Sequence, residues 1–148
     1  MAAEQVADGK FVVRALSVQR DGTVASFKRD PSRHRAFMRR FHTRTGNNPE
    51  RFNYLGEWHS HPSFLALPSG PDVRQMQALI EDREQASLFL VLMVIKLARE
   101  GTLIGSAHAF RRHMLPIRIR LEGELQLVHE EPELSSPLAF RRMGRFRG

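Results

Sequence analysis

The chain has 148 residues, of which 41% are hydrophobic and 26% are charged, and it carries a net charge of +7. This length and apolar content suit one globular domain with a buried core. Cysteine is absent, which excludes disulfides, cysteine-based zinc sites and a cysteine nucleophile. The first ten residues lack the apolar stretch of a secretory signal, and the longest apolar run, residues 86–98, is too short to cross a membrane. We therefore expect a cytoplasmic protein.

Strand and turn patterns dominate the first part of the chain. Residues 10–18 are rich in β-branched and apolar side chains and predict a strand. The turn at 20–23 contains Asp-Gly, a pair suited to positive φ, and predicts a return into a partner strand at 24–27. Asp30 followed by proline marks the start of a helix that runs to Gly46.

Strands and helices alternate in the middle of the chain. Residues 54–61 predict a strand, and a proline-bounded loop follows at 62–68. Ser69 stands where a helix cap belongs, and apolar residues at helical spacing predict a helix over 69–83. The continuous apolar run at 87–95 is typical of a strand buried on both faces. Further strands are predicted at 101–111 and 115–130.

This order predicts one α/β (α+β) domain in which helices flank a mixed β-sheet. Residues 132–148 are polar and basic, and we expect them to form a tail outside the domain of residues 1–131. The tail is a candidate contact for an acidic protein partner or for nucleic acid, because positive charge attracts both. No membrane partner is expected.

Two histidines lie two residues apart near the end of the strand predicted at 54–61. His59 and His61 therefore point to the same face. Pro62 keeps His61 extended. Asp72 falls in the first turn of the next helix, and the loop between them is long enough to bring that turn back to the strand end. Two imidazoles and one carboxylate then converge and leave a fourth position for water, which is the ligand set of catalytic zinc.

The spacing of these residues resembles a family signature. It reads His-x-His, seven residues, Ser, two residues, Asp, with His59, His61, Ser69 and Asp72 at the four fixed positions. This is similar to the signature of the JAMM/MPN+ metalloproteases, and the flanking "YLGEWHSHP" and "PSGPD" resemble its prokaryotic JAB branch. The resemblance implies a single MPN/JAB-type domain with a curved sheet flanked by helices.

The resemblance also implies a function. The family hydrolyses peptide or isopeptide bonds next to the C-terminal tail of ubiquitin or a ubiquitin-like protein, which would be the substrate here. His59, His61 and Asp72 would be the Zn²⁺ ligands, and the metal would activate a water near neutral pH. Ser69 would donate its hydroxyl to the oxyanion of the tetrahedral intermediate. The alternative role of Ser69 is that of a helix N-cap.

One part of the family pattern is missing. The family carries an upstream glutamate as general base on a strand of the type E-x-G-G, and residues 1–16 hold no such segment. We expect the usual N-terminal helix and Glu-bearing strand to be absent or abbreviated. Three alternatives stay open: the start of the chain is truncated and the base is lost, Glu4 serves as the base, or Glu57 or an outside acid takes part. Glu57 shares a face with His59 and is suited to orienting a ligand.

Other functions are compatible with the same residues. Without a base, the domain would be a catalytically inactive binding module of this fold. Two histidines and one carboxylate are also the facial triad of mononuclear iron oxygenases, although the serine offset argues against iron. Trp58 alternates with the histidines and should face the core of the domain. The apolar residues 63–67 either pack inward or form a wall of the substrate groove.

Overall fold

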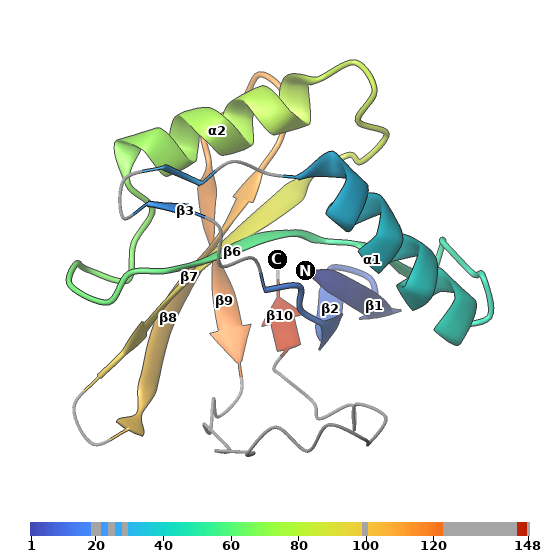
Figure 1. Cartoon of the computed structure of the whole chain (residues 1–148), viewed down its shortest axis with the longest axis horizontal. Coiled ribbons are helices and arrows are strands. Elements are labelled where there is room, and N and C mark those ends of the chain that lie inside the picture. The colour runs from blue at the N-terminus through green and yellow to red at the C-terminus, as the bar shows by residue number, and fades with distance from the viewer. Residues whose placement is uncertain (19–21, 24–25, 28–29, 99–100, 123–144, 148) are drawn as a thin grey trace.

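Figure 1 shows the computed structural model, in which a curved β-sheet carries two helices on one side. The structure describes the whole chain except residues 19–21, 24–25, 28–29, 99–100, 123–144 and 148. The helices in the described part are α1 (Pro31–Arg44) and α2 (Gly70–Glu81). The strands are β1 (Ala2–Ala7), β2 (Lys10–Ala15), β3 (Gly22–Thr23), β4 (Ser26–Phe27), β5 (Phe52–Tyr54), β6 (Gly56–Ser60), β7 (Leu90–Leu97), β8 (Leu103–Phe110), β9 (Ile117–Glu122) and β10 (Arg145–Arg147).

One eight-stranded sheet, with the order β5-β1-β2-β10-β9-β8-β7-β6, forms the body of the molecule. β6 and β7 run parallel and the other neighbours run antiparallel, so the predicted mixed sheet is confirmed. The two end strands, β5 and β6, are separated in sequence by Leu55 alone. Leu55 donates its N–H to Met1 O at 3.0 Å and accepts from Val91 N at 2.8 Å. The sheet therefore curls until its first and last strands meet at this residue.

Strand β7 is buried on both faces, as its continuous apolar run predicts. Val91 and Met93 belong to a core shared with residues of β1, β2 and β8. Leu92 and Val94 belong to a second core, which α2 closes with Met76. Burial of each such side chain contributes roughly 1.5–3 kcal/mol. β7 is thus a rigid support for β6, its parallel neighbour.

Both helices begin where the sequence predicts. The Asp30 side chain caps α1 and accepts from the N–H groups of Ser32 at 2.8 Å and Arg33 at 3.3 Å. The helix packs on β5 through Phe41, whose ring centroid lies 6.3 Å from that of Phe52. α2 packs on β7 and β8. Within the described part of the chain, neither helix combines the length and the apolar content that a membrane span requires.

The first hairpin differs from the expected one. The sequence predicts that residues 10–18 pair with 24–27, but β2 pairs with β1 instead, and β3 pairs with β4 in a separate small sheet. The turn between β1 and β2 contains Asp8 and Gly9, and Gly9 has a φ of 64°. Glycine adopts this conformation without steric cost. The turn of the hairpin that contains β2 is therefore formed by Asp8 and Gly9 and not by Asp21 and Gly22.

The C-terminal stretch also differs from the expected independent tail. β10 lies between β2 and β9 and pairs antiparallel with both. It supplies backbone partners to two strands that would otherwise present unpaired edges to each other. Residues 132–144, and the part of the predicted strand 115–130 that follows residue 122, lie outside the described residues.

Candidate metal centre

Strand β6 and the residue after it position the two histidines. Side chains alternate along the strand, so His59 lies on the face opposite Trp58. Trp58 packs against the core and its indole N–H donates to Ser17 O at 2.9 Å, which confirms that this tryptophan faces the core. Just beyond β6, His61 continues the pairing with β7 by donating its backbone N–H to Ile95 O at 2.9 Å. Both imidazole-bearing residues are therefore anchored through β7.

The first turn of α2 positions the carboxylate. Ser69 is the N-cap of the helix, and its Oγ accepts from Asp72 N at 3.3 Å. Asp72 Oδ2 in turn accepts from Ser69 N at 2.7 Å, which completes a capping box. Such a box satisfies two N–H groups that the helix start would leave unpaired. It also holds the Asp72 side chain, which is 12% exposed, against the start of the helix.

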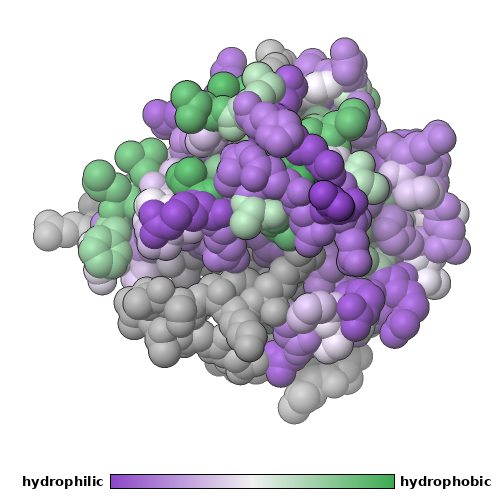
Figure 2. Space-filling model, turned by 90° about the horizontal axis from the view of Figure 1, so that it is seen from above, coloured by the Kyte–Doolittle hydropathy of each residue, from purple (hydrophilic) through white to green (hydrophobic). Residues whose placement is uncertain are grey.

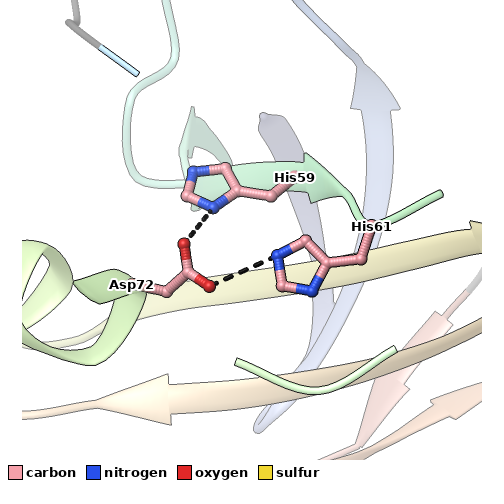
Figure 3. A group of neighbouring side chains, drawn as sticks. All are labelled: His59, His61 and Asp72. Carbon is pink, nitrogen blue, oxygen red and sulfur yellow. Dashed lines mark hydrogen bonds and ion pairs between the residues drawn. The ribbon is translucent and has the colours of Figure 1, made fainter. Parts of the chain in front are cut away.

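Asp72 lies between the two imidazole rings (Figure 3). Its Oδ1 is 2.8 Å from His59 Nδ1, and its Oδ2 is 3.3 Å from His61 Nε2. One potential ligand atom from each residue lies within 4.8 Å of the other two. The loop at 62–68 therefore does bring the helix start back to the strand end, as the spacing in the sequence predicts.

The Asp72 carboxyl group is held in its charged form. Burial raises its pKa, but hydrogen bonds from Ser69 and His59 have a larger combined effect and leave the pKa of Asp72 below its ordinary value. The Ser69 hydroxyl takes part, with its Oγ 2.6 Å from Asp72 Oδ2. Ionised carboxylates and neutral imidazoles are donors that zinc accepts, so this set of side chains fits a metal ion.

The loop between the strand and the helix contacts one of the histidines. His61 Nδ1 lies 3.2 Å from the carbonyl oxygen of Leu65. With the proton on Nδ1, His61 donates to this carbonyl and leaves the Nε2 lone pair on the side of Asp72. Sequence reasoning missed this contact, because a backbone carbonyl has no side-chain signature.

The apolar side chains of the same loop do not pack inward. Phe64, Leu65 and Leu67 are all exposed. Figure 2 shows hydrophobic residues gathered toward the left of the molecule, the side on which this loop lies in Figure 1. Of the two alternatives for residues 63–67, the structure therefore favours a surface beside the histidine cluster.

Glu57 is tied to a neighbour on β5. It precedes His59 by two residues on β6, and the Tyr54 hydroxyl donates to its Oε1. The Tyr54 ring meets the His34 ring of α1 edge-on, with centroids 4.7 Å apart. Tyr54 was not singled out from the sequence, although it stands three residues before Glu57 in "YLGEWH".

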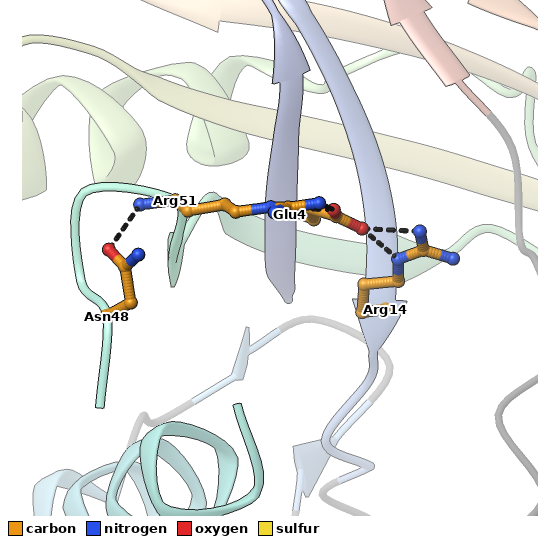
Figure 4. A network of polar contacts seen from close by, with 4 residues as sticks. All are labelled: Glu4, Arg14, Asn48 and Arg51. Atoms are coloured by element: carbon orange, nitrogen blue, oxygen red, sulfur yellow. Dashed lines mark hydrogen bonds and ion pairs between the residues drawn. The ribbon is translucent and has the colours of Figure 1, made fainter. Parts of the chain in front are cut away.

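Glu4 belongs to a different cluster (Figure 4). Its carboxylate accepts from Arg14 Nε at 2.7 Å and from Arg51 Nε at 2.9 Å. Burial raises the pKa of Glu4, but these two arginines outweigh burial and hold the pKa below its ordinary value. Among the described residues, Glu4 is not part of the group formed by His59, His61 and Asp72. The structure thus gives Glu4 a role in joining β1, β2 and the loop before β5.

Comparison with known proteins agrees with this geometry. A family model for prokaryotic homologues of the JAB domain matches residues 3–112. The chain belongs to this family. The matched region runs from β1 to just past β8 and includes every residue of the histidine and aspartate cluster. The JAB-type α/β fold predicted from the motif is therefore confirmed.

A curated relative is similar over a shorter stretch. It is a "CD-NTase/cGAS isopeptidase" from Enterobacter hormaechei subsp. hoffmannii (strain UCI 50), 34% identical over 67 residues. The match covers 45% of this chain and 37% of the relative. No solved structure matches the chain.

Proposed function

We propose that this domain is a zinc-dependent hydrolase of peptide or isopeptide bonds at the C-terminal tail of a ubiquitin-like protein. The observation that carries the proposal is the convergence of two imidazoles and one charged carboxylate within 4.8 Å, in a chain of the JAB family. The name of the Enterobacter relative supports an isopeptide bond as the target.

His59, His61 and Asp72 would hold the metal ion. Zinc at this position supplies Lewis-acid chemistry and makes a water nucleophilic near neutral pH. Ser69 has two tasks in this proposal. It holds Asp72 in the capping box, and its hydroxyl would turn from Asp72 toward the oxyanion that develops on the substrate carbonyl. Hydrogen bonds of the second kind typically contribute roughly 3 kcal/mol to the transition state.

In this proposal, Glu57 is the acid that supports the cluster of His59, His61 and Asp72. It shares a strand face with His59, and Tyr54 fixes its carboxylate. A supporting role and a proton-transfer role predict different results for Glu57→Gln. If Glu57 orients a ligand, zinc affinity falls roughly 10- to 100-fold. If it accepts the proton from the attacking water, kcat falls roughly 10²- to 10⁴-fold while zinc stays bound.

A second candidate function is a catalytically inactive binding module of the same fold. The observation that favours it is the engagement of Glu4 by Arg14 and Arg51, which leaves the base expected for this family without an evident counterpart on β1. Such a module would still hold zinc and grip a ubiquitin-like tail, but it would not cut it.

Cleavage of a ubiquitin-like protein fused through its C-terminal tail to a fluorescent protein tests the proposal. The zinc-loaded protein should release the fluorescent protein, a chelator should stop the release, and added zinc should restore it. Asp72→Asn should abolish release, whereas the matched variant Asp82→Asn at the other end of α2 should not. Zinc bound without cleavage of any such fusion, together with retained binding of the tail, would support the inactive module instead.

Metal content decides the nature of the ion. Elemental analysis of the purified protein should find zinc at about one equivalent, as expected for one site with three protein ligands. Iron without zinc would instead support the facial triad of an oxygenase.

A further inference from the structure

Helix α1 carries an unusual concentration of positive charge. Residues 31–44 contain five arginines and two histidines but neither aspartate nor glutamate. All five arginines are exposed: Arg33, Arg35, Arg39, Arg40 and Arg44. None of them belongs to the histidine and aspartate cluster, so the function of this surface is a separate question.

The five arginines occupy the solvent-exposed half of the helix, here called the arginine face, in two rows that lie roughly 140° apart around the helix axis. Arg33, Arg40 and Arg44 follow each other at spacings of seven and four residues, which places them on one line along the helix axis. Arg35 and Arg39 are four residues apart and form a second line. At 1.5 Å per residue, the set extends over roughly 16 Å. Along one strand of DNA, about five phosphate-to-phosphate steps cover the same length.

Most of this charge is unpaired within the described part of the chain. Arg33 pairs with Asp30 at 3.4 Å. Within the described residues, Arg35, Arg39, Arg40 and Arg44 form no ion pair. The buried side of the helix packs on β5 through Phe41, whereas all five arginines are exposed to solvent. The side of the molecule on which α1 lies is coloured mostly hydrophilic in Figure 2.

The side chains around the arginines favour one kind of partner. Within the described residues, none of the exposed large hydrophobic side chains lies between residues 31 and 44. A protein interface normally needs buried aromatic or aliphatic anchors, and an amphipathic helix needs exposed apolar residues to enter a membrane surface. Binding to phosphate groups needs only charge and hydrogen-bond donors.

A shallow, open hollow adjoins the last turns of α1. It has a volume of about 370 Å³ and is lined by Arg39, His42, Thr43, Asn47 and Pro49. Guanidinium, hydroxyl and amide groups are the side-chain donors that contact nucleic-acid phosphates.

We propose that the arginine face of α1 binds the phosphate backbone of double-stranded nucleic acid without sequence preference. This surface is distinct from the proposed hydrolytic site, and the inference does not depend on the proposed function. The proposal assigns nucleic-acid binding to α1 and not to the C-terminal residues 132–148, part of which form strand β10.

The test compares two triple variants of the full chain. Arg35→Gln, Arg39→Gln and Arg40→Gln together remove three charges from the face, and they spare Arg33 and Arg44, which have roles at the helix ends. The matched control removes three exposed arginines elsewhere, with Arg83→Gln, Arg111→Gln and Arg118→Gln. Fluorescence anisotropy of a labelled duplex of about 20 base pairs is then followed from about 50 to 250 mM NaCl.

The wild type should bind the duplex with a steep dependence of log K on log salt. The α1 triple variant should bind at least about tenfold more weakly at low salt, and its slope should be shallower by roughly 2 to 3, since each lost phosphate contact removes about 0.9. The control should keep the wild-type slope. Thermal unfolding monitors the fold of both variants.

Three results would overturn the proposal. The first is absence of duplex binding at the lowest salt. The second is an equal loss in both triple variants, which would mean a general effect of net charge. The third is binding to a polyglutamate peptide or to anionic phospholipid vesicles, lost in the α1 variant, when the duplex is not bound.

Discussion

At the scale of single residues, the Ser69 hydroxyl stands out because two tasks compete for it. In the structure it accepts from Asp72 N and donates to Asp72 Oδ2 at 2.6 Å. To stabilise an oxyanion, the same hydroxyl has to turn its proton away from Asp72. The hydroxyl therefore cannot donate to Asp72 and to the oxyanion at the same time. Substitutions of Ser69 can separate its role in the helix cap from its role in catalysis.

We predict that Ser69→Ala and Ser69→Gly differ in stability but not in activity. Alanine at an N-cap costs about 1 kcal/mol of unfolding free energy, whereas glycine costs only a few tenths. Both remove the oxyanion donor, so both should lower kcat roughly 10²- to 10³-fold. Urea unfolding and fusion cleavage measure the two effects, with Ser60→Ala at the exposed last residue of β6 as the control. Full activity of Ser69→Gly would show that Ser69 acts through the cap alone.

We predict that Glu4→Gln lowers the stability of the fold but leaves catalysis intact. The substitution leaves Arg14 and Arg51 without their counter-charge, which should lower the unfolding free energy by roughly 1–3 kcal/mol. Zinc content and kcat should stay within a few-fold of the wild type. A folded, zinc-loaded Glu4→Gln variant whose kcat has dropped more than about 100-fold would instead identify Glu4 as the general base.

The cluster of His59, His61 and Asp72 could be predicted from the sequence because strand alternation and helix capping are local rules. His59 and His61 share a face because side chains alternate along a strand with a period of two residues. Ser69 marks the start of the helix whose first turn holds Asp72. The partners of Glu4 and Glu57 could not be predicted. Arg51 is 47 residues from Glu4, and their contact depends on the pairing of β1 with β5.

At the scale of elements, the position of β6 depends on a close approach to β7. Gly56 opens β6 with a φ of 147°. A Cβ atom built there would lie 1.9 Å from Val91 O. Only glycine tolerates both the conformation and the contact, so Gly56 sets the distance between the strand that carries His59 and its support.

We predict that Gly56→Ala either prevents folding or costs more than about 3 kcal/mol of unfolding free energy, since backbone atoms have to move. Gly70→Ala is the matched control. Its Cβ would meet only the end of the Arg74 side chain, at 3.4 Å. Urea unfolding and far-ultraviolet circular dichroism measure both variants. A Gly56→Ala protein as stable as the control would refute the close packing of β6 on β7.

Most elements after residue 30 follow the sequence patterns, whereas before it the sequence does not predict β1 and predicts the wrong partner for β2. Both helices and β7 have strong local signals in caps and apolar runs. β1 reads "AAEQVA", a sequence of low strand propensity that is held by pairing on both sides. β10 joins strands that are far away in sequence, and local patterns contain no information on such pairing.

At the scale of the whole molecule, acid should destabilise the metal-free fold. The pKa values of Glu4, Asp30 and Asp72 lie below their ordinary values, so the unfolded chain takes up protons first as the pH falls. Their stabilising contribution is present above about pH 4 and is lost as the pH drops through the lowered values. Urea unfolding midpoints should therefore fall steeply below about pH 4.

As the pH falls, His108 should begin to lower the stability of the fold at a higher pH than the three carboxylates do. Burial and the charge of Arg118 lower the pKa of His108, so its contribution is complete above about pH 6.5 and declines below it. Between about pH 7.5 and 5.5, His108→Gln should lose less stability than the wild type, while exposed His113→Gln should follow the wild type. Identical pH profiles for all three proteins would refute the burial of His108.

The zinc K-edge X-ray absorption spectrum of the zinc-loaded protein tests the central claim, that His59, His61 and Asp72 share one ion. The account predicts nitrogen and oxygen neighbours at about 2.0–2.2 Å with the scattering signature of two imidazoles. Asp72→Asn should change the oxygen shell and keep the imidazoles. A spectrum without imidazole scattering, or one that Asp72→Asn leaves unchanged, would contradict the account.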